Sequence, residues 1–276
     1  MHFRIGNREV SLHHLKLAGD LSRERKWLLG ARLLPQSPSA TNPFSMLYEN
    51  AKQSLRSRDL DAATLSIMRL RWFRERLTEV AHHDYKLARL FFRRLRTNSL
   101  GDYFGALCEL NNACILISRN LPFKCPDPPD FEVQVDRFLS ANLECTSTHL
   151  SGESGKALNY KIESAIADKK QKAYANDRTA LIIDTTNVMF FSHKGGHDMN
   201  PQGLREHINE SVKECGFGAI ILQSQIGDFR PNGLIALELV YERIDGKTTS
   251  VELKALLDML FPAGEHLLMN PIFPRL

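Results

Sequence analysis

The sequence predicts an α/β fold: a mixed β-sheet flanked by helices, preceded by a mostly helical N-terminal domain. Two observations predict it. Between residues 50 and 96 there is no proline or glycine, and apolar residues such as Leu65, Met68 and Trp72 recur at helical spacing. After about residue 98, short strand-like runs alternate with helix-like runs. We therefore expect two domains, residues 1–97 and residues 98–276.

The predicted elements follow in chain order. A short strand-like run opens the chain, and a loop at 33–45 is marked by three prolines with Ser, Thr and Asn. The spacing of apolar residues in 59–96 predicts at least two helices that form a hairpin. The later elements are a helix at 101–119, strands at 130–136 and 141–148, a charged helix at 155–175 with Ile162, Ile166 and Ala173 on one face, a strand at 179–186, a helix within 200–215, strands at 218–225 and 234–242, and a last helix at 250–260.

Composition limits the class of protein. The chain has 276 residues, of which 43% are hydrophobic and 25% charged, as in a folded globular protein. No uncharged apolar run reaches 18 residues, and the N-terminus lacks the apolar core of a signal peptide. We therefore expect a cytoplasmic protein without a membrane partner. Five cysteines without a CxxC pair predict buried thiols rather than a zinc site or a disulfide framework.

Charge is distributed unevenly along the chain. Residues 1–96 hold 19 Lys and Arg against 9 Asp and Glu, whereas residues 97–276 hold 17 against 23. A basic half beside an acidic half suggests a part that binds a polyanion. The candidate nucleic-acid ligands are the arginines Arg69, Arg71, Arg74, Arg76, Arg93 and Arg94. The alternative is that these arginines form the solvated face of amphipathic helices.

Two predicted strands bring carboxylates together. In "DFEVQVD" a period of two places Asp130 on the face opposite Phe131, and in "NLECTST" it places Glu144 and Thr146 on one face. If the strands pair through the turn between them, Asp130 and Glu144 converge at the strand ends. With the backbone carbonyl of Cys145 they form a hard-oxygen pocket for Mg²⁺ or Mn²⁺. Asp130 has an alternative role as a turn residue after two prolines.

The order of these acids resembles a known family. A helix with Glu109, then "PPD" at Asp130, then "LECT" at Glu144, then a charged helix and an apolar strand, is similar to the restriction-endonuclease-like PD-(D/E)XK nuclease superfamily over residues 101–222. The resemblance implies a restriction-endonuclease-like core and metal-dependent hydrolysis of phosphodiester bonds, most often in DNA, in a role such as bacterial defence. It makes Asp130 and Glu144 metal ligands and Glu109 a further acid, although Glu109 can equally point to solvent.

The chain departs from the family at Thr146, which occupies the position of the motif lysine. A threonine hydroxyl donates a hydrogen bond but carries no charge. Some members of the superfamily carry the lysine on the next helix, and here that region holds Lys156, Lys161, Lys169, Lys170 and Lys172. Helical phase directs Lys169 toward the sheet, and Lys161 is the second choice. The alternative is that all five are surface lysines.

A glycine-rich segment after the second predicted strand suggests a P-loop at first sight. "SGESGKA" lacks the glycine spacing of a phosphate-binding P-loop, and Ala157 stands where its Ser or Thr belongs. A second hypothesis is a catalytically inactive nuclease-fold module that binds nucleic acid or a protein partner. A third is a regulatory protein whose basic helices bind another protein. A homodimer is compatible with each.

Overall fold

The computed structural model describes residues 2–5, 8–35, 42–126, 128–148, 158–186, 215–229, 235–263 and 267–269. The chain divides into two compact units. The first contains the described residues of 1–103 and 227–237, and the second contains those of 104–226 and 238–270. The helix predicted within 200–215, Lys156 and the "SGESGKA" segment lie outside the described residues.

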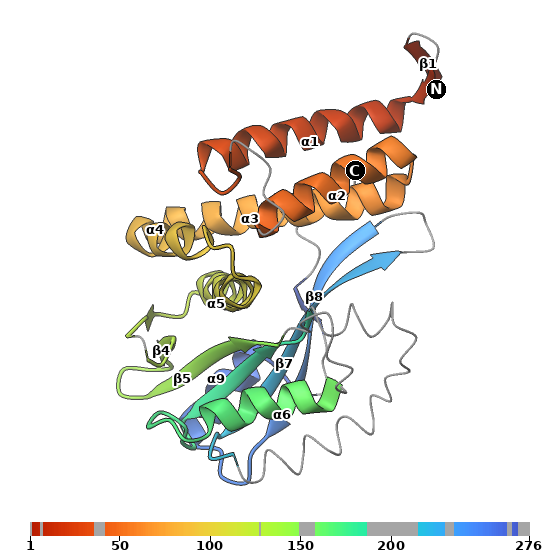
Figure 1. Ribbon diagram of the computed structural model, residues 1–276. Helices are drawn as coiled ribbons and strands as arrows, with labels where there is room; N and C mark the ends of the chain where they lie inside the picture. Colours follow the sequence, from red (N-terminus) through yellow and green to blue (C-terminus); the bar gives the residue numbers. More distant parts are fainter. Residues whose placement is uncertain are drawn as a thin grey trace. The chain divides into compact units, whose positions relative to one another are not determined.

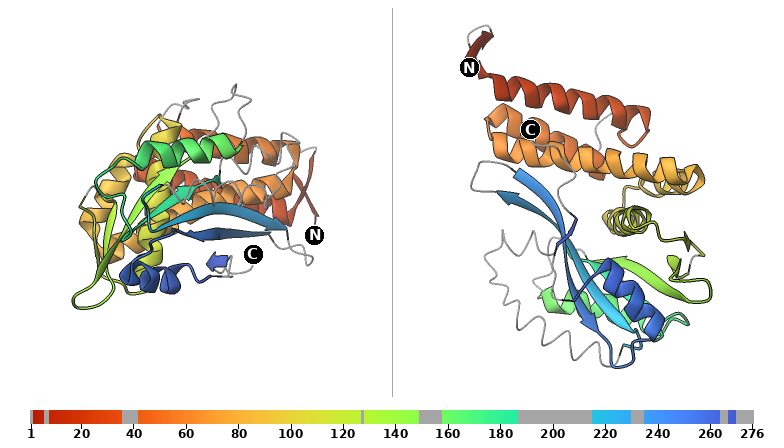
Figure 2. Two further views of the ribbon diagram at one scale, coloured as in Figure 1. Left: turned by 90° about the horizontal axis from the view of Figure 1, so that it is seen from below. Right: turned by 180° about the vertical axis from the view of Figure 1, so that it is seen from behind.

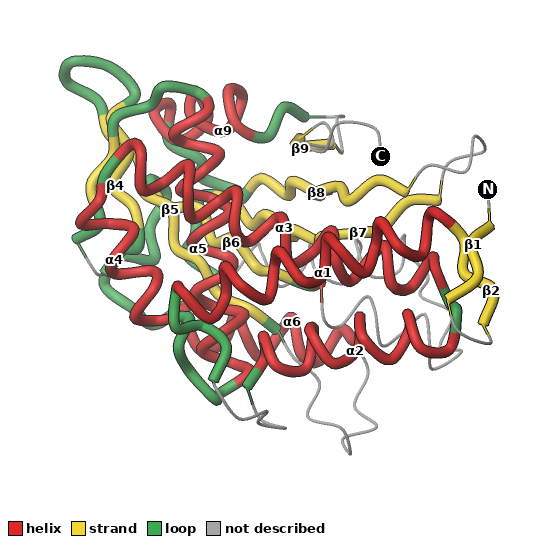
Figure 3. Tube along the Cα trace, turned by 90° about the horizontal axis from the view of Figure 1, so that it is seen from above, coloured by secondary structure: helices red, strands yellow, loops and turns green. Residues whose placement is uncertain are grey.

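The first unit is mainly helical. A short antiparallel pair, β1 (His2–Ile5) and β2 (Arg8–Ser11), precedes its helices. The helices are α1 (Leu12–Gly30), α2 (Pro43–Ser57), α3 (Leu60–His83) and α4 (Tyr85–Arg94). Both α1 and α2 pack against α3 (Figures 1 and 3). The prediction of at least two helices in residues 59–96 is confirmed.

Local capping explains where α3 ends and α4 begins. Oδ1 of Asp84 accepts hydrogen bonds from the backbone N–H groups of Lys86 at 2.7 Å and Leu87 at 3.2 Å. An aspartate at this position satisfies N–H groups that have no partner inside the helix. The apolar faces of the unit meet in an aromatic cluster, in which the rings of Phe44 and Phe73 lie 5.0 Å apart in an edge-to-face arrangement.

The second unit is built on a mixed sheet, as predicted. Its strand order is β3-β4-β5-β6-β7-β8-β9. The strands are β3 (Phe123–Lys124), β4 (Phe131–Gln134), β5 (Ser140–Ser147), β6 (Thr179–Asp184), β7 (Ala219–Phe229), β8 (Ile235–Asp245) and β9 (Leu267–Met269). The pairs β3–β4, β4–β5 and β8–β9 are antiparallel, whereas β5–β6 and β6–β7 are parallel. The protein is therefore an α/β protein.

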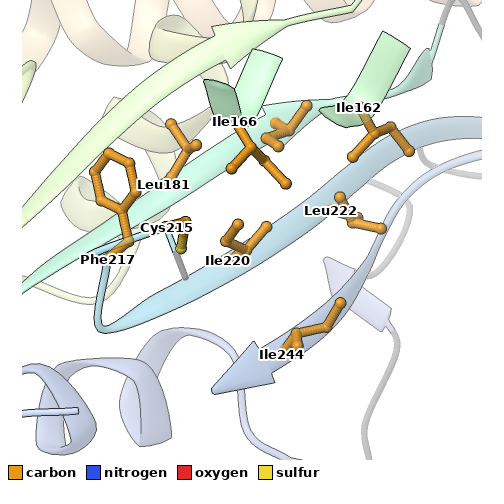
Figure 4. Packing of buried hydrophobic residues seen from close by; sticks show 9 residues of the cluster. Ile162, Ile166, Leu181, Cys215, Phe217, Ile220, Leu222 and Ile244 are labelled. Carbon is orange, nitrogen blue, oxygen red and sulfur yellow. The ribbon is translucent and has the colours of Figure 1, made fainter. Parts of the chain in front are cut away.

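Helices cover both faces of this sheet. Helix α6 (Leu158–Lys169) lies on one face and α9 (Val251–Leu260) on the opposite face (Figure 2). Ile162 and Ile166 of α6 pack on Leu181 and Ile220 of the central strands (Figure 4). Helix α5 (Leu100–Ser118) precedes the sheet in the chain and agrees with the helix predicted at 101–119.

The prediction for the charged helix was wrong at its C-terminal end. Helix α6 ends at Lys169, and Ala173 is exposed rather than on the buried face. Backbone turns follow, with the N–H of Lys172 bonded to the carbonyl of Lys169. These turns bring Tyr174 against the buried cluster that contains Ile166 and Leu181, and they lead the chain into β6. Tertiary packing of Tyr174 thus overrides the helical propensity of the residues before it.

Two further observations concern the class of protein. No helix among the described residues is long and apolar enough to cross a membrane. All five cysteines carry free thiols, and each except Cys125 is buried.

Candidate active site

The two acidic residues predicted from the sequence, Asp130 and Glu144, lie side by side at the end of the β4–β5 pair. In the antiparallel register Phe131 lies opposite Leu143, so Asp130, immediately before β4, comes beside Glu144. Oδ2 of Asp130 accepts a hydrogen bond from the N–H of Cys145 at 2.7 Å, and the N–H of Asp130 donates to Oε2 of Glu144 at 3.4 Å. The predicted pairing of the two strands is confirmed.

Glu144 is the most constrained group of this site. It is only 3% exposed, and its Oε1 accepts hydrogen bonds from Nζ of Lys169 at 2.6 Å and from the hydroxyl of Tyr174 at 2.8 Å. The parallel register places Glu144 beside Leu181, which packs under α6. The side chain therefore lies on the sheet face that α6 covers, where Lys169 ends that helix.

Electrostatics sets Asp130 apart from an ordinary aspartate. Burial, the carboxylate of Glu109 and then that of Glu144 raise its pKa to about 8, against the hydrogen bond from Cys145 and the charge of Lys169. The carboxylates of Glu109 and Glu144 thus both act on Asp130, and the ammonium group of Lys169 opposes them. The site carries more negative than positive charge when its acids are ionised, and an added cation would relieve that imbalance.

The charge of Glu144 shifts the pKa values of Lys169 and Tyr174, the two groups that donate hydrogen bonds to it. Burial would lower the pKa of Lys169, but the hydrogen bond and the charge of Glu144 outweigh it and raise that pKa above its usual value. Burial and the hydrogen bond to Glu144 raise the pKa of Tyr174 to about 12. Lys169 therefore stays protonated at neutral pH, and Tyr174 is a neutral hydrogen-bond donor.

The donor set fits a hard divalent ion in part. Asp130 and Glu144 supply carboxylate oxygens and Cys145 a backbone carbonyl, which is the chemistry that Mg²⁺ and Mn²⁺ prefer. Glu109 is 7% exposed on α5 and acts on Asp130 through its charge. Within the described parts of the chain, however, no group of three or more His, Cys, Asp or Glu side chains is placed to hold a metal. An ion here would depend on the two carboxylates and the carbonyl.

The remaining candidates from the sequence take different positions. Thr146 lies half-buried on β5, two residues from Glu144 and on the same face. Lys161 is half-buried on α6 and makes no ion pair among the described residues. The structure thus brings Lys169, rather than Lys161, to the carboxylates.

Sequence reasoning missed a second group of polar residues. Asp184, at the end of β6, is 1% exposed, and its Oδ1 accepts the N–H of Thr186 at 2.8 Å. Burial raises its pKa to about 6. Nδ2 of Asn112 on α5 donates to Oε1 of Gln223 on β7 at 3.1 Å. The signal in the sequence was a charge at the end of the buried run "TALIID".

Tyr174 was missed for another reason. Its local sequence predicts a continuous helix over 155–175, and such a helix gives the Tyr174 hydroxyl no defined partner. Its contact with Glu144 depends on the turns after α6 and on the parallel pairing of β5 with β6. Neither feature is visible in local periodicity.

Most of the candidate arginines on α3 have partners inside the first unit. Nη1 of Arg74 lies 2.9 Å from Oε1 of Glu24, and Arg71 lies 3.5 Å from Asp20. Glu24 is fully buried, and the Arg74 pair meets the distance of an ion pair without the geometry of a hydrogen bond. Burial raises the pKa of Glu24 more than the arginines lower it. These arginines compensate buried acids.

Arg76 does not lie on the surface, contrary to the expectation of a phosphate contact. It is 2% exposed, its guanidinium lies 4.6 Å from the ring centroid of Trp72, and Nη1 bonds to Glu79 at 2.9 Å. Burial also lowers the pKa of Arg69, which is half-buried. On α4, Arg93 is exposed and Arg94 is half-buried. Of the six candidate arginines, only Arg93 on α4 is exposed.

Comparison with known proteins adds no relative. No family model, curated protein or solved structure matches this chain. The class that the fold defines is an α/β protein with a mixed sheet, and any functional conclusion depends on the residues described above.

Proposed function

We propose that the protein is a metal-dependent nuclease with a restriction-endonuclease-like core, acting on phosphodiester bonds of nucleic acid, DNA above all. The observation that carries the proposal is the convergence of Asp130, Glu144 and Lys169 at one strand end. Two acids from paired strands and a lysine from the following helix are the groups that the resembled superfamily uses. Lys169 supplies the positive charge that Thr146 lacks.

Each residue has a role in this proposal. Asp130, Glu144 and the carbonyl of Cys145 would hold Mg²⁺ or Mn²⁺, which supplies Lewis acidity toward a phosphate oxygen when bound. Lys169, already 2.6 Å from Glu144, would place a fixed positive charge beside the phosphate and stabilise the negative charge that develops during hydrolysis. Tyr174 holds Glu144 in position through its hydroxyl group.

A specific observation favours a second candidate, the catalytically inactive module. Lys169 and Tyr174 already satisfy Oε1 of Glu144, so this buried carboxylate needs no metal to offset its charge. In that case the cluster stabilises the fold, and the protein acts by binding nucleic acid or a protein partner. The two candidates differ in whether the protein turns over substrate.

Cleavage assays separate the two candidates. Single- and double-stranded DNA and RNA are incubated with the protein in Mg²⁺ or Mn²⁺, and the wild type is compared with Asp130→Asn, Glu144→Gln, Lys169→Met and Lys161→Met. We expect loss of cleavage in the first three variants and retention in Lys161→Met. Matched controls are Glu132→Gln, a neighbouring carboxylate on β4, and Lys172→Met, an exposed lysine after α6.

The outcomes point in distinct directions. Cleavage that disappears in the three site variants and persists in both controls supports the nuclease. Cleavage that survives Asp130→Asn and Glu144→Gln in correctly folded protein removes these residues from catalysis. Wild-type protein that binds nucleic acid without cutting it in either metal favours the inactive module.

A further inference from the structure

A groove runs along α4 in the first unit, the unit that does not contain Asp130, Glu144 and Lys169. Its volume is about 560 Å³. It is lined by Tyr85, Lys86, Arg89, Leu90, Phe92, Arg93 and Arg96. The lining combines cationic and aromatic side chains, and of this set only Arg93 is among the nucleic-acid ligands predicted from the sequence.

Three of the cationic residues share one side of the helix. Lys86, Arg89 and Arg93 are separated by three and four positions on α4, Arg96 follows just after the helix end, and all four are exposed. None of the described residues that line the groove is acidic. Nη2 of Arg96 donates to the carbonyl of Ala31 at 2.9 Å, which fixes its guanidinium beside the groove.

These cations differ from the arginines of α3. Arg71 and Arg74 lie beside the buried acids Asp20 and Glu24, so their charge is compensated within the protein. In the described part of the chain, Lys86, Arg89 and Arg93 form no ion pair. Like charges on one helix side repel one another, and a polyanion that lies along the groove would remove that repulsion.

Aromatic side chains give the groove a second property. Tyr85 is 68% exposed, so one face of its ring is open to solvent. Phe92 lies further along the groove, half-buried, with its ring centroid 6.5 Å from that of Trp27. An exposed ring beside a row of cationic residues offers a surface on which an unpaired base stacks while its phosphates contact the cations. In a duplex the base faces are already stacked on one another.

We propose that the α4 groove binds single-stranded nucleic acid, with phosphates on Lys86, Arg89, Arg93 and Arg96 and a base stacked on Tyr85. The proposal rests on the nucleic-acid part of the proposed function and specifies the form of nucleic acid that is held. Binding to this groove requires no metal, so it is tested separately from cleavage.

The test measures binding in EDTA by fluorescence anisotropy, with the full-length protein and a fluorescein-labelled oligothymidylate. A hairpin duplex with the same number of nucleotides serves as competitor, and binding is repeated over a series of salt concentrations. We expect the single strand to bind more tightly than the hairpin. Arg89→Glu/Arg93→Glu should weaken binding by more than about tenfold and make the salt dependence shallower by roughly 1.4 in log–log slope, since about 0.7 is lost for each phosphate contact.

Further variants separate the groove from general charge. Tyr85→Ala should weaken single-strand binding roughly tenfold through loss of stacking. The matched control is Arg56→Glu, an exposed arginine of α2 that does not line the groove, and it should change binding by less than about twofold because its charge lies outside the groove. Circular dichroism and melting curves establish that all variants fold.

Several results would overturn the proposal. One is an equal loss in Arg56→Glu and in the groove variants, which indicates an effect of net charge. Another is tighter binding to the hairpin. A third is competition by poly-glutamate as strong as by oligothymidylate together with no effect of Tyr85→Ala, which indicates an acidic protein partner. Binding through the groove without any cleavage would overturn the nuclease proposal alone, and cleavage with binding unchanged in the groove variants would overturn this one alone.

Discussion

The ammonium group of Lys169 lies 2.6 Å from Oε1 of Glu144, and it joins the end of α6 to a carboxylate that is only 3% exposed on β5. The side chain of Lys169 is itself 27% exposed, so the pair sits at the boundary between the interior and solvent. Removing one partner leaves the other charge desolvated and uncompensated.

The first prediction tests this pairing by stability. Lys169→Met should lower the free energy of unfolding by about 2–3 kcal/mol, because Glu144 stays buried with one neutral donor. In Lys169→Met/Glu144→Gln the loss should be smaller than the sum of the single losses. Denaturant titrations measure both, with Lys172→Met as the exposed control that changes stability by less than about 0.5 kcal/mol. Additive losses would mean that the two groups are not coupled.

The second prediction concerns metal binding without reference to activity. Mn²⁺ or Mg²⁺ should raise the Tm of the wild type, since an ion that binds only the folded state stabilises it, by about 2.7 kcal/mol at a hundredfold excess over Kd. Asp130→Asn should abolish the shift because it removes a carboxylate oxygen. Glu132→Gln, on the same strand, should retain it. If neither metal changes the Tm of the wild type, the result would argue against an ion at Asp130 and Glu144.

The third prediction uses the pH dependence of Asp184. Burial raises its pKa from 3.8 to about 6, so the folded state holds this proton more tightly than the unfolded state does. The stability that the proton gives is fully present below about pH 4 and is lost as the pH rises through about 6. Relative to Asp184→Asn, the wild type should therefore lose on the order of 3 kcal/mol between pH 4 and pH 7.

The measurement compares unfolding free energies of the wild type and Asp184→Asn across that pH range, so that the other titrating groups cancel. The asparagine keeps an acceptor for the N–H of Thr186, which bonds to Oδ1 at 2.8 Å. A stability difference that stays constant from pH 4 to pH 7 would show that Asp184 titrates as an ordinary aspartate.

The fourth prediction distinguishes buried from exposed arginines. Arg76→Ala should lower the free energy of unfolding by about 2–4 kcal/mol, because it removes a stacked side chain from the interior and leaves Glu79 without that partner. Arg93→Ala, at an exposed position of α4, should cost less than about 0.5 kcal/mol. Thermal and denaturant melts provide the comparison. Equal effects would contradict the assignment of Arg76 to the core.

Local periodicity predicted the parts of the structure that local physics determines. The period of two in "DFEVQVD" and "NLECTST" predicted the strands and the face of Glu144, and the period of 3.6 directed Lys169 toward the sheet. The catalytic roles of these residues stay predictions. The convergence of Asp130 with Glu144 followed from one short turn between adjacent strands.

Long-range contacts determined what the sequence did not reveal. An arginine inside an amphipathic helix looks the same in sequence whether it faces solvent or, like Arg76, stacks on a neighbouring ring in the core. The end of α6 depends on how Tyr174 packs, and the burial of Asp184 depends on which strands flank β6. Each of these requires knowledge of partners far away in the chain.

Glu144 and Cys145 are neighbours on β5 and therefore point to opposite faces of the sheet. If β5 were to slip by one residue against its neighbours, the carboxylate would move to the face now occupied by a buried thiol, beyond reach of Lys169. The cost of an unpaired buried charge would oppose that slip. We therefore expect the ion pair to disfavour the slipped register during folding, and a variant with neutral residues at both positions to enter that register more often even where its native state keeps its stability.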